Sequence, residues 1–273
     1  MAKIIKLKDF DNISGTVTVQ DFDPEDIFMV GNMDMDIATD GLVLWINSNV
    51  KNGKTLPDLS GNGNDVSFDS TGFTFEENGG VSVNSDNGST LTMVTIPETN
   101  ILTLEYTITA TSPAIGYSPV IATYNTREEC GFKFGATQDY YVNYAAMINK
   151  DGDKTGDPKL MDSETMTTTS LAQIGEYGTK TPHHLVVRYT PEIKKLEMFL
   201  DGSLYKYYVD FSETNGVNTL VTKIGFFYTD VNNPYSGSDR KNTILYDAKA
   251  YSKSLSNEEI LKNYNNLVKN GVI

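Results

Sequence analysis

Apolar and polar residues alternate along much of the chain, with the period of two that half-buried β-strands require. Residues 102–110 show it best, because apolar or aromatic side chains fill the even positions and Thr or Glu fill positions 103, 105, 107 and 109. The pattern predicts an antiparallel strand with one face in the core and the other in water. Further strands are expected at 16–19, 42–46, 91–96, 120–124, 140–147, 184–190, 196–200, 204–209, 223–229 and 243–251.

The C-terminal region departs from this pattern and has the period of a helix. Ser256 and Glu259 have the spacing of a capping box, and Gly271 follows the last apolar position. One face of this helix, over residues 256–269, carries the apolar side chains of Ile260, Leu261, Tyr264, Leu267 and Val268. The fold class predicted is therefore all-β, a two-sheet antiparallel jelly-roll sandwich with one C-terminal helix and an N-terminal extended arm.

The single tryptophan, Trp45, lies in the apolar run 42–46 and precedes the turn-forming cluster at 58–65. Gly, Asn, Asp and Ser tolerate positive φ, so this cluster is expected to reverse the chain sharply. An aromatic residue inside an apolar strand is usually buried, so we interpret Trp45 as a core anchor. A sugar-stacking role is the alternative.

Composition narrows the classes of partner. The chain has 273 residues, 36 acidic and 22 basic side chains, and a net charge of −14, which repels nucleic acid and anionic membrane surfaces. The one cysteine, Cys130, excludes an intrachain disulfide. Neither a signal pattern nor an apolar stretch of spanning length is present, so we expect a cytoplasmically made protein with no membrane insertion.

Four segments resemble the laminin-G-like jelly rolls of the concanavalin A-like lectin/glucanase superfamily. They are GLVLWINS at 41–48, DLSGNGNDVSF at 58–68, HHLVVRYTPEIKKLEMFLDGSLYKYYV at 183–209 and ILYDAKAYSKSLSNEEILKNYNNL at 244–267. The resemblance implies one jelly-roll domain over residues 41–273. Within it, Asp201-Gly202 has the composition of a tight hairpin turn, and the adjacent His183 and His184 point to opposite faces, so they do not share a metal.

Catalysis is not expected. Related glucanases carry an E-x-D-x-x-E string that places two carboxylates together on one strand, and this sequence has no such string. It also lacks a G-x-S-x-G elbow and a Walker loop. A glycan-processing enzyme remains an alternative, because carboxylates distant in sequence can meet in space.

An acidic loop is the candidate metal site, and calcium is the only cofactor suggested. Asp151, Asp153, Asp157 and Asp162 provide oxygen ligands at loop spacing, and Gly156 stands where a calcium loop turns. Pro158 and the final Asp depart from the usual loop pattern, so an acidic solvated turn is the competing interpretation.

Four tyrosines in loop-like surroundings are the candidate glycan contacts, because a tyrosine ring can stack on a sugar. These residues are Tyr117, Tyr124, Tyr177 and Tyr235. The alternative is that tyrosines simply fill half-buried strand positions.

Residues 1–40 lie outside the resemblance and contain too few apolar residues for a core of their own, so we interpret them as an attachment arm. The favoured function is a non-catalytic display protein that presents the jelly roll for glycan or surface binding, such as a bacteriophage virion component assembled in the host cytoplasm. Its expected partners are other virion or surface-assembly proteins and a cell-surface glycan. A freestanding lectin module, cytoplasmic or at the cell surface, is the alternative.

Overall fold

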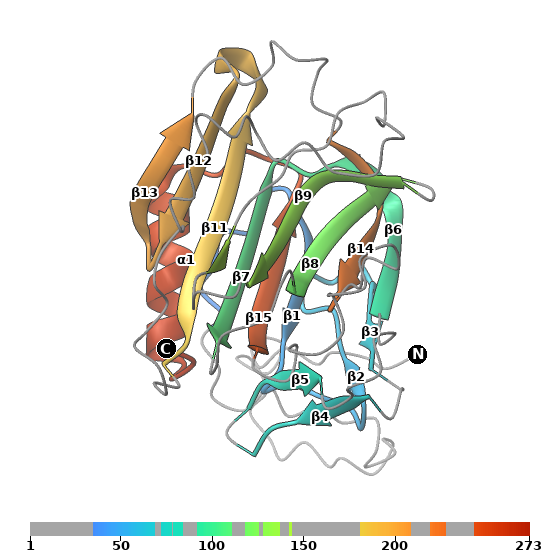
Figure 1. The fold of residues 1–273 in the computed structure, drawn as a ribbon. Helices are drawn as coiled ribbons and strands as arrows, with labels where there is room; N and C mark the ends of the chain where they lie inside the picture. Colours follow the sequence, from blue (N-terminus) through green and yellow to red (C-terminus); the bar gives the residue numbers. More distant parts are fainter. Residues whose placement is uncertain are drawn as a thin grey trace, which may run out of the picture.

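Two antiparallel sheets form the body of the protein (Figure 1). The computed structural model describes residues 35–68, 72–77, 79–83, 92–110, 118–125, 128–136, 142–143, 181–208, 219–227 and 243–273. Strands dominate these residues, and the one α-helix, α1 (Asn257–Lys269), follows the last strand. The prediction of an all-β sandwich with a C-terminal helix is confirmed.

The larger sheet has eight strands. Its order is β13 (Ser203–Tyr208), β12 (Lys195–Leu200), β11 (His183–Thr190), β7 (Thr103–Ala110), β15 (Thr243–Tyr251), β5 (Val81–Val83) and β4 (Phe73–Phe75), and β1 (Leu42–Asn47) pairs with β15. The short 3₁₀ helix η3 (Pro191–Ile193) joins β11 to β12. At the β12–β13 turn, Asp201 and Gly202 have φ of 49° and 75°, which confirms the predicted tight hairpin.

The smaller sheet has five strands and packs against the larger one. Its order is β10 (Val142–Asn143), β9 (Glu128–Ala136), β8 (Ser118–Asn125), β14 (Leu220–Phe226) and β6 (Thr92–Asn100), and a separate pair joins β2 (Thr55–Leu56) to β3 (Val66–Ser67). Strand β9 was not predicted, because Gly131 and Gly135 interrupt its alternation. The predicted strand at 140–147 is described only over β10, and the one at 16–19 lies outside the described residues.

The main core lies between the inner faces of the two sheets. Leu104, Tyr106 and Ile108 of β7 point into it, as the alternation predicted, and meet apolar residues from the smaller sheet such as Ile224 and Phe226. At one end, Phe68 packs edge-on against Phe73 with ring centroids 4.9 Å apart, and the ring of Phe226 adds a second edge contact. Such pairs are stabilised beyond their buried area alone.

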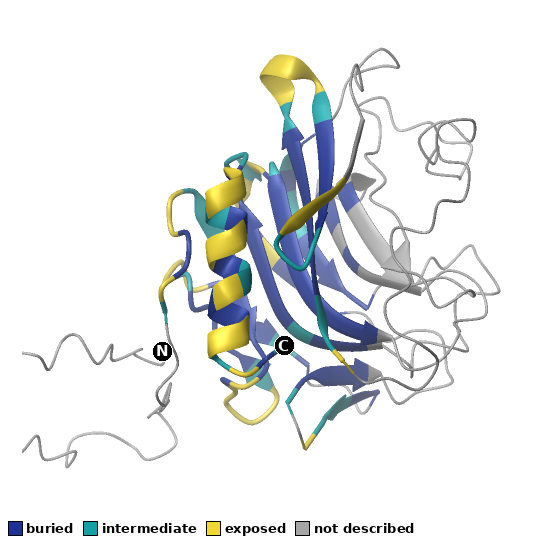
Figure 2. Cartoon of the chain, turned by 90° about the vertical axis from the view of Figure 1, so that its left-hand side faces the viewer, coloured by how far each residue is buried: buried dark blue, intermediate teal, exposed yellow. Residues whose placement is uncertain are grey.

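The outer face of the larger sheet is also buried, and here the predicted wet face is wrong. Helix α1 lies across it with one flank buried and the other exposed, as Figure 2 shows. The polar residues of β7 expected in water are all buried: Thr103, Glu105, Thr107 and Thr109. A capping box between Ser256 and Glu259 starts the helix as predicted. No helix in the described ranges is long and apolar enough to span a membrane.

Trp45 is buried, but on the outer side of the sheet rather than between the sheets. It packs with Ile37, Val50 and Leu59, while its neighbours Leu44 and Ile46 enter the main core. Ile37 and Ala38 belong to the last six residues of the predicted arm, so this part of the arm is packed on the sandwich.

The turn that follows Trp45 is a hydrogen-bonded structural element. The buried carboxylate of Asp58 accepts from the backbone N–H groups of Trp45, Ser60 and Asn64, each at 3.0 Å. The side-chain amide of Asn62 donates to the carbonyls of Leu42 and Val43, each at 3.0 Å. These bonds tie the turn to β1, and the positive φ values at its two glycines supply the reversal that the sequence predicted.

Candidate functional site

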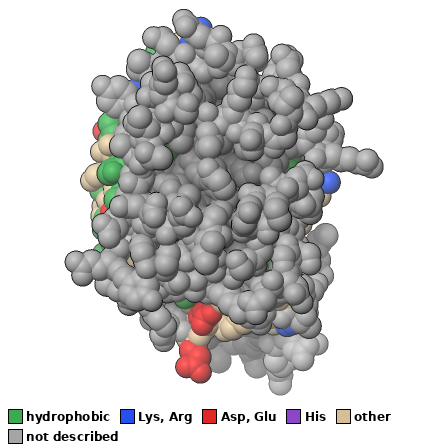
Figure 3. Space-filling model, in the orientation of Figure 1, with side chains coloured by type: hydrophobic (Ala, Val, Ile, Leu, Met, Phe, Trp, Pro, Cys, Tyr) green, Lys and Arg blue, Asp and Glu red, His purple; other side chains and the backbone are tan. Residues whose placement is uncertain are grey.

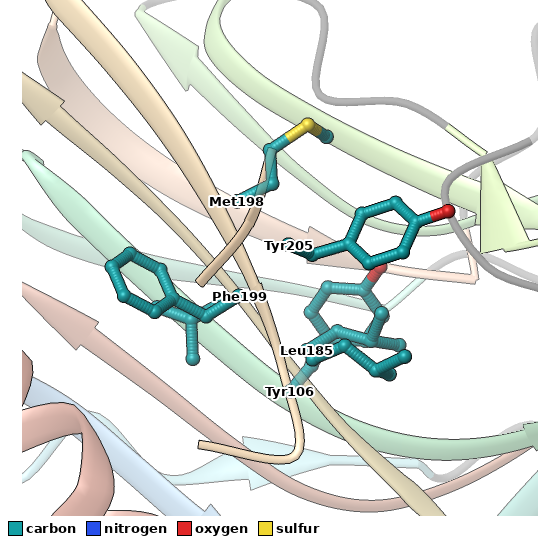
Figure 4. A pocket seen from close by; sticks show the side chains of 7 residues that line it. Tyr106, Leu185, Met198, Phe199 and Tyr205 are labelled. Carbon is teal, nitrogen blue, oxygen red and sulfur yellow. The ribbon is translucent and has the colours of Figure 1, made fainter. Parts of the chain in front are cut away.

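The inner face of the larger sheet carries an apolar site where β11, β12 and β13 lie side by side. Figure 4 shows the rings of Tyr106 and Tyr205 on the same side of the strands, with Phe199 on the other side. Leu185, Met198 and Leu200 complete the floor. Register explains the cluster, because Leu185 pairs with Leu200 on one side and Tyr106 on the other, and neighbouring partners in a sheet share a face.

Tyr205 is the member of this site that solvent reaches. Its exposed fraction is 46%, whereas Tyr106 below it is buried, and burial raises the pKa of the Tyr106 hydroxyl well above its ordinary value. The cavity measures only about 10 Å³, which is too small to admit a sugar ring. An exposed tyrosine ring offers an apolar surface on which the C–H face of a sugar can pack.

A histidine–carboxylate pair lies next to this floor. The Nδ1 of His183 is 2.8 Å from Oδ2 of Asp201, and Oδ1 of Asp201 accepts the backbone N–H of His184 at 3.0 Å. The two side chains are 22% and 30% exposed. His183 precedes Leu185 by two residues on the same face, and Asp201 follows Leu200 directly. The pair therefore supplies polar groups at the edge of an apolar surface, which is the combination that sugars require.

A second group of chemically capable residues is sealed beneath α1. The amide of Asn263 donates to Glu105 Oε1 at 2.9 Å and to the Tyr251 hydroxyl at 2.8 Å. Glu105 Oε2 also lies 3.4 Å from Nε2 of His184. Burial raises the pKa of Tyr251 far above its ordinary value. All four residues are fully buried, so they anchor the helix and are inaccessible to a substrate.

A buried ion pair lies beside this group. Lys249 Nζ pairs with Asp247 Oδ1, and Asp247 Oδ2 accepts from Trp45 Nε1 at 2.8 Å and from the Asn47 amide at 3.1 Å. Lys249 Nζ also lies 5.5 Å from the centre of the Trp45 ring. The single tryptophan thus contacts a buried charge pair in two ways, because its indole N–H donates to Asp247 and its ring lies beside the Lys249 ammonium.

Most of the sequence-predicted site residues lie outside the described residues. These are Tyr117, Tyr177 and Tyr235, together with Asp151, Asp153, Asp157 and Asp162. Tyr124 is described, and it is a buried residue of β8, with an exposed fraction of 4%. The described residues contain no cluster of three or more His, Cys, Asp or Glu side chains suited to a metal.

The sequence does not single out Tyr205, because its surroundings, LYKYYV, are typical of tyrosines that fill strand positions. Its strand β13 lies at the edge of the larger sheet, and a register shift places Tyr205 between Leu204 and Lys206, which pair with the consecutive β12 residues Phe199 and Met198. A bulge leaves one residue without a cross-strand partner and re-aims its side chain. Two adjacent aromatic or apolar residues, Leu204 and Tyr205, are thus both exposed on β13, and only the pairing shows it.

Comparison with known proteins gives a fold and no family. No family model and no curated protein sequence matches the chain. Among solved structures, the botulinum neurotoxin serotype D ligand-binding domain in complex with N-acetylneuraminic acid matches with a TM-score of 0.56 and 15% identity, over 83% of this chain and 51% of that one. The binding domain of Paraclostridial mosquitocidal protein 1 gives 0.55 and 16%, over 83% and 52%.

A Trypanosoma rangeli sialidase in complex with sialic acid also matches, with a TM-score of 0.52 and 13% identity over 82% of this chain and 32% of that one. The chain thus spans about half of the toxin binding domains and a third of the sialidase. At these identities the similarity concerns the fold alone. The described part of this chain has an antiparallel β-sandwich fold similar to that of these toxin binding domains.

Proposed function

We propose that this protein is a non-catalytic, lectin-like module that binds a surface glycan through the inner face of β11–β13. The observation that carries the proposal is Tyr205, a residue 46% exposed above an apolar floor, in a fold shared with a domain bound to N-acetylneuraminic acid. Ring stacking on Tyr205 provides apolar contact, and the His183–Asp201 pair offers hydrogen bonds to hydroxyl groups at its edge.

The arrangement of the two faces supports a display role, for example in a bacteriophage virion. Residues 35–40 are fixed on the outer face, where the Ala38 N–H donates to Asn263 Oδ1 at 2.8 Å and Ile37 packs on Trp45. Tyr205 belongs to the opposite, inner face. An attachment through residues 1–40 to other virion or surface-assembly proteins therefore leaves the glycan site on the other face.

A glycan panel followed by titration tests the glycan site. The full-length protein is screened against sialylated and neutral glycans, and the best ligand is titrated into the wild type, Tyr205→Ala and Leu204→Ala. Leu204 is the matched control, because it immediately precedes Tyr205 on β13 and is 44% exposed. It pairs with Phe199 and therefore belongs to the opposite face of the sheet. We expect Tyr205→Ala to weaken binding about tenfold, the value of roughly 1.4 kcal/mol of stacking, and Leu204→Ala to leave it unchanged.

Equal affinity in the two variants would remove Tyr205 from the site, and no binding to any glycan would end the proposal. Sialidase activity of the full-length protein on a fluorogenic sialoside would instead support the glycan-processing alternative.

For the display role, a variant lacking residues 1–34 is expected to retain glycan binding and to fail to join its parent assembly. Normal incorporation of that variant would contradict the attachment role.

We also propose that the acidic loop binds calcium weakly, through Asp151, Asp153, Asp157 and Asp162. A divalent cation would relieve the mutual repulsion of these four carboxylates. Isothermal calorimetry with millimolar calcium is expected to give a weak exothermic or endothermic binding signal that disappears when all four are changed to Asn. A signal that survives the four substitutions would place the ion elsewhere, and no signal would leave the loop as a solvated turn.

A further inference from the structure

The solvent-facing stripe of α1 is the second notable surface of the molecule. Glu258, Leu261, Lys262, Asn265 and Lys269 lie on one side of the helix, and with Asn266 and Asp36 they line a groove of about 340 Å³. Figure 2 shows this side of the helix as exposed along its length. Lys262 pairs with Asp36 at 2.7 Å, so the groove includes the segment that precedes β1.

Apolar side chains gather along one flank of this stripe. Leu261 and Val268 are each 46% exposed and are seven residues apart, so they lie two helical turns apart on the same flank. Leu204 of β13 extends the flank, because its strand contacts α1 and the hairpin residue Gly202 lies against Leu261. Figure 3 shows hydrophobic side chains at the edge where α1 and β13 lie in Figure 1.

Charge order along the stripe makes it complementary to itself. Glu258 lies at the N-terminal end and Lys269 eleven residues later, about 16 Å along the axis at 1.5 Å per residue. An antiparallel copy whose two-fold axis passes midway between Asn263 and Tyr264 places each Glu258 opposite Lys269 of the other copy. About this axis, Leu261 and Val268 of the other copy lie on the same flank of the helix pair. Measured along the helix axis, they are offset by only about 3 Å.

We propose that this stripe is a homodimer interface, in which α1 packs antiparallel against α1 of a second copy. An isologous contact needs one patch that complements itself. Along this stripe Glu258 and Lys269 stand at opposite ends, Leu261 and Val268 lie between them, and the charge of the central Lys262 is paired with Asp36 of the same chain. Three helical turns form a small interface by the standard of stable complexes. The dimer is therefore weak, with a Kd on the order of ten micromolar, and it doubles the valency of any site on the module.

Sedimentation velocity of the full-length protein at concentrations spanning the expected Kd tests the interface. The wild type is expected to shift from monomer to dimer. Lys269→Glu places two acidic groups opposite each other and should weaken the dimer about tenfold or more. The double variant Glu258→Lys/Lys269→Glu recreates both ion pairs in reverse and should restore it. Leu261→Lys should abolish the dimer, while Ile193→Lys, at a 61% exposed residue of η3, should not.

A wild type that stays monomeric throughout, or a double variant as weak as Lys269→Glu, would overturn the proposal. So would Ile193→Lys and Leu261→Lys losing the dimer equally. Thermal unfolding of each variant identifies misfolding, since a misfolded variant unfolds far below the wild-type temperature. If Lys269→Glu is such a variant, Lys269→Gln replaces it, and an intermediate weakening of the dimer is expected. The result is independent of the glycan site, since Tyr205 lies on the inner face.

Discussion

The inner and outer faces of the eight-stranded sheet are built by alternate residues of the same strands, yet they are held by different chemistry. In β7, Leu104 and Tyr106 enter the apolar core between the sheets, whereas Glu105 between them is equally buried under α1. In β15, Ala248 faces the core and the buried Lys249 faces outward. Burial alone therefore does not distinguish the two faces.

The difference shows how a polar strand face becomes part of a folded interior. On the outer face, Glu105, Asp247 and Asn263 each have specific hydrogen-bond partners, and α1 together with residues 35–40 provides several of them. The inner face needs only shape and apolar area, because dispersion and the hydrophobic effect are not directional. The outer face should thus be sensitive to loss of single atoms, and the inner face to loss of volume.

The largest effect is expected from Asp247→Ala on the outer face. It leaves Lys249 as a buried charge without its carboxylate and removes the acceptor of Trp45 Nε1 and Asn47. We expect a loss of about 4 kcal/mol in the free energy of unfolding, measured by urea denaturation. Adding Lys249→Met should recover a large part of that loss. A double variant no more stable than Asp247→Ala alone would contradict the ion-pair explanation.

On the inner face, Leu104→Ala removes apolar volume and no hydrogen bond. The side chain is fully buried within the main core, so a loss of about 3 kcal/mol is expected from lost transfer energy and the cavity. Leu104→Met should lose less than half as much, because it nearly conserves the volume. Equal losses in the two variants would mean that shape, and not volume, governs this face.

Asn263→Ala tests the hydrogen bonds that join α1 to the sheet. It removes the acceptor of the Ala38 N–H and the donor to Glu105 and Tyr251, so that buried polar groups lose a partner. We expect a loss of about 2 kcal/mol and faster hydrogen exchange at residues 35–40. Asn265→Ala on the exposed side of the same helix is the control, and it should change the stability by less than about 0.5 kcal/mol.

The smallest effect concerns pH. Burial tends to raise the pKa of Glu197, but hydrogen bonds from Lys195 and Arg188 outweigh it and lower the pKa below its ordinary value of 4.5. Because the folded-state pKa is the lower one, these ion pairs stabilise the fold above pH 4.5, and the stabilisation is lost as pH falls through the folded-state value. Glu197→Gln should therefore cost about 1 kcal/mol at pH 7.

The free energies of unfolding of the wild type and Glu197→Gln, measured as a function of pH, should accordingly become equal as the pH falls below 4.5. The Leu104→Ala difference should stay constant over the same range, since no titrating group is involved. A pH-independent gap for Glu197→Gln would show that its side chain stabilises the fold through packing on Arg188 and not through charge.

Several elements could be predicted because local signals agree with the tertiary structure. The capping box at Ser256 and Glu259, the hairpin at Asp201-Gly202 and the alternation in β7 each appear where the sequence places them. Strands β2 to β5 are two or three residues long and have no periodic signal of their own. Their existence depends on pairing partners distant in the sequence, so local pattern could not reveal them.

The candidate site was less predictable than the fold. Tyr124 and Tyr205 look alike in sequence, each within a short apolar or aromatic strand, yet one is buried in β8 and the other exposed on β13. Both tyrosines lie beside a register shift, but β8 lies between β9 and β14 in the smaller sheet, whereas β13 is an edge strand of the larger one. The proposed glycan contact therefore rests on register and exposure, and the loop composition that suggested Tyr124 carried no such information.

By itself, the sequence determined the local elements that short-range energetics controls, such as caps, positive-φ turns and alternating strands, because these depend on neighbours within a few residues. It also determined that Trp45 is buried. Only the tertiary structure decided on which face Trp45 lies, that Glu105 and its neighbours on β7 are covered, and that Asn263 joins α1 to residues 35–40. Those outcomes depend on contacts between residues up to 225 positions apart, and a local pattern carries no information about such distant partners.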